Sequence, residues 1–344
     1  MQNNTPPIFA RPSQNEDAVT QCKRLWVRLP NWLGDVIMAL PVLRAVKEDR
    51  PDMEITLVGK RAFEPLVRRL GIADSFVPLP DRGAGYFRFF YRYRRRPPDI
   101  YLLLTNSLRS DLEAFLTRSS CRIGMVRPGK FRPLLTQPYR LAADTDESQI
   151  HQTLVWEQMI RFYGSSEALD FQPVDQPETP RFSKRIGLIC GTENSPKKRW
   201  PIAHWRQLLD GLLQSDPSIT VQLYGTPADR EIATQVCEGF VDSRVRNMAG
   251  ETDLNEFCDA LSACHVVCCN DTGGMHLANF LGTAVVAVFG PTNPIRTGPI
   301  FSAAVTVLQP DNCPPHGGAA IEKVTVEQGI NAVRNLLSDA IEVD

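Results

Sequence analysis

Short apolar runs alternate with helix-forming segments along most of this chain, and this alternation limits the folds that it can adopt. The clearest instance begins with an apolar run at 265–269, which leads into the polar turn Asn270–His276. A helical segment ending at Gly282 follows, and then a second apolar run at 284–289. Strand, polar turn, helix and strand in this order form a βαβ unit. Repeated along the chain, the pattern predicts an α/β fold built on parallel sheets.

The alternation occurs in two blocks, which a proline-rich stretch separates. Between Asp170 and Ser183 the chain is polar and contains three prolines, a composition typical of a linker. A length of 344 residues also favours two domains of ordinary size. The first residues are polar and dotted with proline, which predicts disorder. The predicted organisation is a disordered lead-in at 1–21, a first domain at 22–170, a linker at 171–184, a second domain at 185–325 and a C-terminal helix at 326–344.

The composition is that of a soluble protein from a reducing compartment, so we expect it in the cytoplasm. No apolar stretch approaches the ~20 residues of a membrane span, and the N-terminus lacks a signal-peptide pattern. Nine cysteines without a C-x-x-C pair argue against a disulfide framework. The apolar runs around Cys190 and Cys268-Cys269 predict buried thiols. We expect no metal site, because Cys313 and His316 supply only two ligands, whereas a structural zinc site usually has four.

Charge is unevenly distributed along the chain. Residues 1–172 hold 25 Lys+Arg and 19 Asp+Glu, whereas the remaining residues hold 13 and 20. Much of the positive charge lies at 86–96, where arginines alternate with aromatic residues. A solvated helix face explains such a run more often than a ligand does; the functional alternative is contact with an anionic partner or with membrane headgroups. We do not expect nucleic acid binding, because the whole protein is not basic and contains no known nucleic-acid module.

Polar loops follow several predicted strands, at the sheet edge where doubly wound folds bind their ligands. Asp35 suits a helix cap as well as a general base, and Asn106-Ser107 suits a helix start as well as a ligand contact. The three cations at 197–199 suit a pyrophosphate or a solvated loop equally. Asp229 stands shortly after a predicted strand, a place where an acidic side chain can bind a ribose diol. No G-x-G-x-x-G or P-loop motif occurs, which argues against nicotinamide dehydrogenases and P-loop enzymes.

The turn Asn270–His276 joins a strand to a helix, so its free backbone N–H groups and the helix dipole favour an anion there. A plain glycine turn is the alternative. Taken in order, the motifs resemble the ADP-heptose:lipopolysaccharide heptosyltransferases, glycosyltransferase family 9, and most closely the heptosyltransferase II branch. The likeness extends from about Leu25 to Thr297. It rests on Asn31–Asp35, Asn106-Ser107, the loop 196–201, and Asn270–His276 leading to Gly290-Pro291-Thr292.

The resemblance implies a GT-B architecture, with two Rossmann-like doubly wound domains facing across a cleft. It implies inverting transfer of heptose from ADP-L-glycero-D-manno-heptose to the lipopolysaccharide inner core, with Asp35 as general base. The implied donor-binding residues are Thr192, Lys198, Asp229, Asp271, Thr272, Gly273, Gly274 and His276. The implied acceptor-binding residues are Asn31, Asn106, Ser107 and Arg109. No cofactor or metal is implied beyond the ADP-sugar itself. A lipid-linked core acceptor also implies peripheral contact with the cytoplasmic face of the inner membrane.

Two other functions fit the same residues. The chain could be a paralogous transferase that moves another nucleotide sugar to a cell-envelope glycan, or a catalytically silent nucleotide-sugar binding protein. Gly274 stands where the family usually carries a larger apolar residue, which predicts a looser turn or a different sugar. Asp35 argues against a silent protein, because a decayed site need not keep its base.

Overall fold

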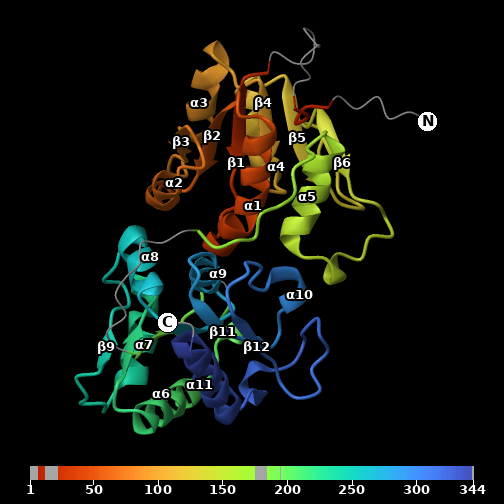
Figure 1. Ribbon diagram of the computed structural model, residues 1–344. Helices are drawn as coiled ribbons and strands as arrows, with labels where there is room; N and C mark the ends of the chain where they lie inside the picture. Colours follow the sequence, from red (N-terminus) through yellow and green to blue (C-terminus); the bar gives the residue numbers. More distant parts are fainter. Residues whose placement is uncertain (1–6, 12–21, 175–183, 194, 343–344) are drawn as a thin grey trace. The chain divides into compact units, whose positions relative to one another are not determined.

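The structure is a computed structural model that describes residues 7–11, 22–174, 184–193 and 195–342 (Figure 1). It divides into two compact units. The first comprises residues up to Glu147 together with Gln152–Asp170, and the second comprises Ser148–His151 and the chain from Phe171 onward. Most of the predicted lead-in, and residues 175–183 of the predicted linker, lie outside the described residues.

The first unit is a six-stranded parallel sheet in the order β3-β2-β1-β4-β5-β6, flanked by helices (Figure 1). Its strands are β1 Arg24–Arg28, β2 Glu54–Gly59, β3 Ser75–Pro78, β4 Ile100–Leu103, β5 Cys121–Val126 and β6 Gln137–Arg140. Its helices are α1 Leu33–Asp49, α2 Glu64–Leu70, α3 Tyr86–Tyr91, α4 Leu108–Leu116 and α5 Gln152–Phe162, with 3-10 turns η1 Arg61–Phe63, η2 Arg92–Arg95 and η3 Glu147–Gln149.

The second unit repeats this plan with the strand order β12-β11-β10-β7-β8-β9, again all parallel. Its strands are β7 Lys184–Ile189, β8 Ile219–Leu223, β9 Val245–Asn247, β10 Val266–Asn270, β11 Ala284–Val288 and β12 Val305–Leu308. Its helices are α6 Ile202–Ser215, α7 Arg230–Cys237, α8 Leu254–Ser262, α9 Gly273–Phe280, α10 Pro294–Thr297 and α11 Val326–Glu342, with 3-10 turns η4 Pro196–Lys198, η5 Pro227–Asp229 and η6 Ile321–Lys323.

Helices cover both faces of each sheet, so successive strand residues are buried on opposite sides. In the first unit α1 packs against α5, and α3 packs against α4. Trp26 and Tyr101, on neighbouring strands, belong to a core cluster that also contains Phe90 of α3 and Ala114 of α4. In the second unit α6 packs against α11 over a separate core. The predicted burial of Cys190, Cys268 and Cys269 is confirmed, with exposed fractions of 3%, 0% and 0%.

Counted within each unit, both sheets have the Rossmann order 3-2-1-4-5-6. The predicted α/β fold with two Rossmann-like doubly wound domains is therefore confirmed. The sequence did not predict β5, β6, β9 or β12. Three of these are short edge strands, and β6 contains Pro138, whose missing N–H is tolerated only at an edge.

One part of the predicted lead-in is packed against the first unit. Ile8 and Phe9 are 3% and 0% exposed, the Phe9 N–H donates to the Tyr163 carbonyl at 2.8 Å, and Arg50 donates to the Ile8 carbonyl at 2.9 Å. The prediction of disorder is wrong for this stretch because two adjacent apolar side chains anchor it. No helix in the described part of the chain combines the length and the apolar character that a membrane crossing would need.

Candidate functional site

Each sheet has one topological switch point, where the strand order reverses, and ligands of such folds bind outside the carboxyl ends of the strands there. In the second unit the switch point lies between β7 and β10. The loop after β7 carries Lys198, and the turn after β10 carries Asp271. In the first unit the switch point lies between β1 and β4. The loops after these two strands carry Asp35 and Asn106. The predicted residues therefore gather at both switch points.

The two loops of the second unit are joined by an ion pair. Lys198 Nζ donates to Asp271 Oδ2 at 2.7 Å, and the two side chains are 21% and 7% exposed. The sequence predicted both residues at the donor but did not predict that they would pair. Because Asp271 is nearly buried, the pair fixes the ammonium at the edge of the sheet while leaving part of it open to solvent.

Asn270, the last residue of β10, holds the same loops together and is completely buried. Its Oδ1 accepts from the Trp200 backbone N–H at 3.0 Å, and its Nδ2 donates to the Cys190 carbonyl at 2.7 Å. The amide therefore bridges both ends of the β7 loop. A polar residue ending a buried apolar strand was the available signal in the sequence.

Helix α9 begins directly after Asp271. Thr272 occupies its N-cap in an extended conformation, and its side chain makes no capping bond. The Thr272 hydroxyl is buried without a hydrogen-bond partner among the described residues. The first backbone N–H groups of the helix, from Gly273 onward, have no acceptor within the helix. This end of α9 therefore presents unused donors beside Lys198, an arrangement suited to an anion.

Gly274 lies in a packed environment. A β-carbon at this position would lie 2.5 Å from Ile189 Cδ1 and 3.2 Å from Phe257 Cζ. The missing side chain thus lets β7 and α8 approach α9 closely. The expectation of a looser turn is wrong, because neighbouring side chains fill the space that the glycine leaves.

His276 lies one turn into α9 and is 4% exposed. Its pKa is lowered to about 4, mainly by burial and also by His151 and Lys198, while the charge of Asp271 opposes the shift. His151 is also buried, and burial lowers its pKa to about 4. Its Nε2 lies 3.1 Å from the Gly298 carbonyl and therefore carries the proton. Both rings are neutral near pH 7. His151 was missed because it stands far from these loops in sequence.

Two further predicted donor residues are already engaged within their loops. The Thr192 hydroxyl donates to the Ser195 carbonyl at 2.8 Å and accepts from Arg199 Nε at 3.3 Å. Asp229 is 6% exposed, and its Oδ2 accepts from the backbone N–H and the hydroxyl of Thr226 at 2.9 and 2.7 Å. The bond from the Thr226 backbone N–H is one half of a capping box at η5. Both side chains shape the edge of the site, and their contact with a ligand stays a prediction.

In the first unit, Asp35 lies in the first turn of α1 and is partly buried. Asn31, in the same loop, accepts from Arg28 Nη2 at 3.1 Å. Arg28 is itself buried and donates to Glu113 Oε2 at 2.8 Å, while the Tyr86 hydroxyl donates to the other Glu113 oxygen. Burial and the Glu113 contact raise the pKa of Tyr86. A charged residue inside the apolar run 25–29 was the sequence signal for this buried network, and it was missed.

The loop after β4 leads directly into helix α4, so the interpretation of Asn106-Ser107 as a helix start is confirmed. Ser107 is the N-cap, and its Oγ accepts from the Ser110 N–H at 3.2 Å. Asn106 accepts from Arg132 Nη1 at 3.0 Å, and Arg132 also pairs with the buried Asp111. Arg109 is exposed and lies over the Tyr86 ring, 5.6 Å from its centre. Contact of these side chains with an acceptor stays a prediction.

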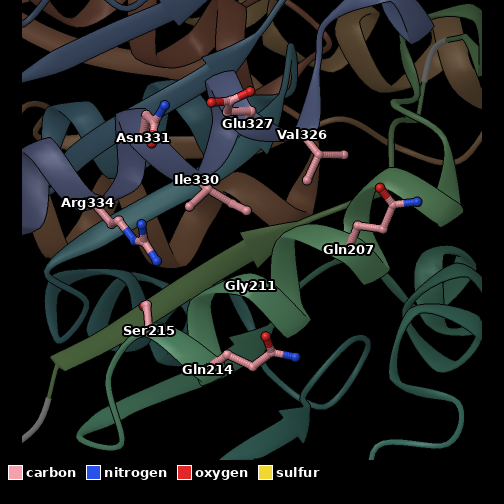
Figure 2. A pocket seen from close by; sticks show the side chains of 9 residues that line it. All are labelled: Gln207, Gly211, Gln214, Ser215, Val326, Glu327, Ile330, Asn331 and Arg334. Atoms are coloured by element: carbon pink, nitrogen blue, oxygen red, sulfur yellow. The ribbon is translucent and has the colours of Figure 1, made fainter.

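A groove of about 570 Å³ lies elsewhere on the second unit, along the seam between α6 and α11 (Figure 2). Its lining residues are Gln207, Gly211, Gln214, Ser215, Val326, Glu327, Ile330, Asn331 and Arg334. Three of its four α6 residues, Gly211, Gln214 and Ser215, belong to the half of the helix that leads to the amino end of β8, away from the switch point. The groove therefore belongs to helix packing rather than to the candidate site. Among the described residues, no group of three or more potential metal ligands lies together.

Comparison with known proteins identifies the family of the chain. The profile of Glycosyltransferase family 9 (heptosyltransferase) matches residues 86–320. The chain is 27% identical to lipooligosaccharide heptosyltransferase 2 of Haemophilus ducreyi, over 81% of this chain and 86% of that protein. It is 28% identical to lipopolysaccharide heptosyltransferase 2 of Escherichia coli K12, over 80% of this chain and 85% of that protein.

Solved structures share the fold. The structure of E. coli ADP-heptose lps heptosyltransferase II superposes with a TM-score of 0.79 at 23% identity, covering 92% of this chain and 99% of that one. The E. coli heptosyltransferase WaaC with ADP superposes with a TM-score of 0.71 at 20% identity, covering 92% and 99%.

Two Rossmann-like units with polar loops at both switch points, together with the profile match, place the protein in the GT-B class of glycosyltransferases. Within that class the chain belongs to glycosyltransferase family 9, the heptosyltransferases, whose profile matches more than half of its length.

Proposed function

We propose that the protein transfers heptose from ADP-L-glycero-D-manno-heptose to the inner core of lipopolysaccharide, with inversion at the anomeric carbon. The observation that carries the proposal is the Lys198–Asp271 pair at the switch point of the second unit, beside the open N-terminus of α9. Relatives named for this activity on lipopolysaccharide, and a heptosyltransferase structure that contains ADP, support the choice of donor and acceptor.

The proposed donor site meets the charge of the diphosphate with fixed groups. Lys198 supplies a cation that Asp271 holds in place, and the first N–H groups of α9 supply dipoles. Negative charge grows on the leaving ADP as the glycosidic bond breaks, so donors that are already oriented stabilise the transition state more than the ground state. We assign no step to a metal or to a cofactor, because these residues supply the required positive potential.

Asp35 is the proposed general base. Its carboxylate takes the proton of the acceptor hydroxyl as that oxygen bonds to the anomeric carbon and the bond to ADP breaks. A single displacement of this kind inverts the configuration. Asn31, Asn106, Ser107 and Arg109 are the proposed acceptor contacts. The partners are then ADP-heptose and a lipid-linked core acceptor, and we propose that the protein acts in the cytoplasm at the surface of the inner membrane.

The test is a transfer assay with purified protein, ADP-heptose and a heptose-deficient core acceptor, read by mass spectrometry. We expect the acceptor to gain the mass of one heptose. A gain only with another nucleotide sugar would replace the proposal with a paralogous transferase. ADP-heptose binding without any gain in mass, across a panel of acceptors, would replace it with a silent binding protein.

A further inference from the structure

The arginine run at 86–96 forms a structured cationic pocket rather than a loose charged surface. A pocket of about 560 Å³ in the first unit is lined by Arg88, Tyr91, Arg92, Arg94, Arg95 and Arg118. The aromatic residues that alternate with these arginines hold the segment in place, because they pack into the core of the first unit. Tyr86 and Phe90 are buried in the core, and Tyr93 packs edge-on against Trp26 at 4.6 Å between ring centres. The intervening arginines are therefore presented together on the other side of α3 and η2.

In the part of the chain that the structure describes, these cations form no ion pair with an acidic side chain. None of the ion pairs among the described residues involves an arginine of this pocket, although most other arginines of the first unit are paired. Arg94 stacks on Tyr91 at 4.5 Å, and its Nε is buried without a hydrogen-bond partner among the described residues. Five guanidinium groups in one pocket repel one another, and an anion with several oxygens relieves that repulsion while accepting their hydrogen bonds.

Arg118 gives a second, independent sign that the pocket is built for charge. It follows the C-terminus of α4 with a φ of 65°, a left-handed conformation that usually selects glycine. Glycine would adopt this backbone without strain. The chain instead carries an arginine, whose side chain completes the lining of the pocket.

The pocket is separate from the candidate acceptor site. Arg95 lies shortly before β4 begins, and Arg118 lies shortly before β5 begins. Both positions are at the amino edge of the sheet, whereas Asp35 and Asn106 follow the carboxyl ends of their strands. A ligand of this pocket is therefore distinct from any group bound at Asp35 and Asn106.

We propose that this pocket binds the phosphate headgroups of anionic phospholipids and docks the first unit on a membrane surface. Phe87 and Tyr91 stand one helical turn apart beside the arginines and are 38% and 54% exposed. Aromatic side chains next to cations are favoured at the boundary between headgroups and acyl chains. The choice of a lipid rather than a free phosphate rests on the proposed function, in which the acceptor is lipid-linked.

The test is co-sedimentation of the full-length protein with vesicles that contain no sugar acceptor. We expect binding to vesicles of equal parts phosphatidylglycerol and phosphatidylcholine, little binding to phosphatidylcholine alone, and weakening as salt rises above about 0.1 M. The triple variant Arg88→Gln/Arg92→Gln/Arg95→Gln should bind at least about tenfold more weakly. The matched control Arg140→Gln/Arg246→Gln/Arg334→Gln removes equal charge from exposed positions on β6, β9 and α11, and it should bind like the wild type.

The variant Arg118→Gly distinguishes a loss of positive charge in the pocket from a loss of folding stability. It should leave the thermal stability equal or higher, because it removes backbone strain, yet weaken vesicle binding severalfold. Equal binding by the triple variant and its control would overturn the proposal. So would displacement of the protein from vesicles by inorganic phosphate at the lipid phosphate concentration, or tighter binding to duplex DNA than to vesicles. Transfer to a deacylated, soluble acceptor is measured in parallel. Vesicle binding without transfer would count against the proposed function alone, and transfer without vesicle binding against the docking pocket alone.

Discussion

Lys198 has a predicted role that the structure makes more specific. Replacing it with alanine should weaken ADP binding by at least about 1.5 kcal/mol, as expected for a charged hydrogen bond. The loss should exceed that of a simple contact, because Asp271 would be left nearly buried and unpaired beside the diphosphate. Isothermal titration of ADP measures the effect. Lys197→Ala is the matched control, since Lys197 is the exposed neighbour in the same loop, and it should change little. An unchanged dissociation constant for Lys198→Ala would remove the contact.

Asp35 is assigned to the acceptor, so its substitution should separate turnover from donor binding. Asp35→Asn should abolish heptosyl transfer, because an amide does not accept the hydroxyl proton. The affinity for ADP should stay nearly unchanged. Initial rates of transfer and titrations of ADP on the same preparation measure the turnover and the affinity. Glu48→Gln, at the exposed far end of the same helix, should leave both quantities as in the wild type. Substantial turnover by Asp35→Asn would exclude the general-base role.

His276 and His151 should make the second unit sensitive to acid. The pKa of each is about 4 in the folded protein and about 6.5 in the unfolded chain. Between these values the unfolded state binds more protons, so stability is full above pH 6.5 and falls as the pH drops toward 4. Each ring contributes up to about 1.4 kcal/mol per pH unit. Urea unfolding at pH 7 and pH 5 measures the loss. His276→Asn should reduce this loss by the contribution of one histidine; an identical pH dependence would contradict the assignment.

At Gly274, helix α9 packs closely against β7 and α8. Alanine usually stabilises a helix relative to glycine, by up to about 1 kcal/mol. At position 274 the added methyl meets Ile189 Cδ1, so Gly274→Ala should instead destabilise by about 1–2 kcal/mol. Ile189→Val removes the obstructing atom. Urea unfolding of both single variants and the double variant should therefore show less destabilisation in the double than the sum of the singles. Additive effects would show that the two elements do not meet there.

The spacing of apolar residues predicted most helices and strands correctly where the periodicity was strong. The run at 54–59 matches β2 residue for residue, and the segment that starts at Val326 is α11. Edge strands such as β9 were missed because three residues with little burial carry no periodic signal. The site was predictable as a set of loops but not as a network. The Arg28–Glu113 and Lys198–Asp271 pairs join residues 85 and 73 positions apart, and no local pattern encodes such contacts.

At the scale of the whole molecule, the two units share one sheet topology, which explains why the alternation of apolar runs and helical segments occurs twice along the sequence. The chain also crosses between the units at a place that the sequence did not reveal. Ser148–His151 belongs to the second unit, although the residues on both sides belong to the first. Asn293 donates to the Ser148 carbonyl at 2.6 Å, and His151 contacts Gly298. Four residues are too few to show a composition of their own, so only tertiary contacts identify them.

Because Ser148–His151 belongs to the second unit, a ligand of that unit should also stabilise this short segment. If ADP binds only the second unit, ADP at about 100 times its dissociation constant should stabilise that unit by about 2.7 kcal/mol. Hydrogen exchange read by mass spectrometry should then slow most in peptides of β7, β10 and α9. The amides of Ile150 and His151 should slow with them, because this segment is held by the second unit. Peptides of β1 and β2 serve as the internal control and should change least. Equal slowing in both units would show that the donor stabilises the molecule as one body, and exchange at 150–151 that follows the first unit would contradict the crossing.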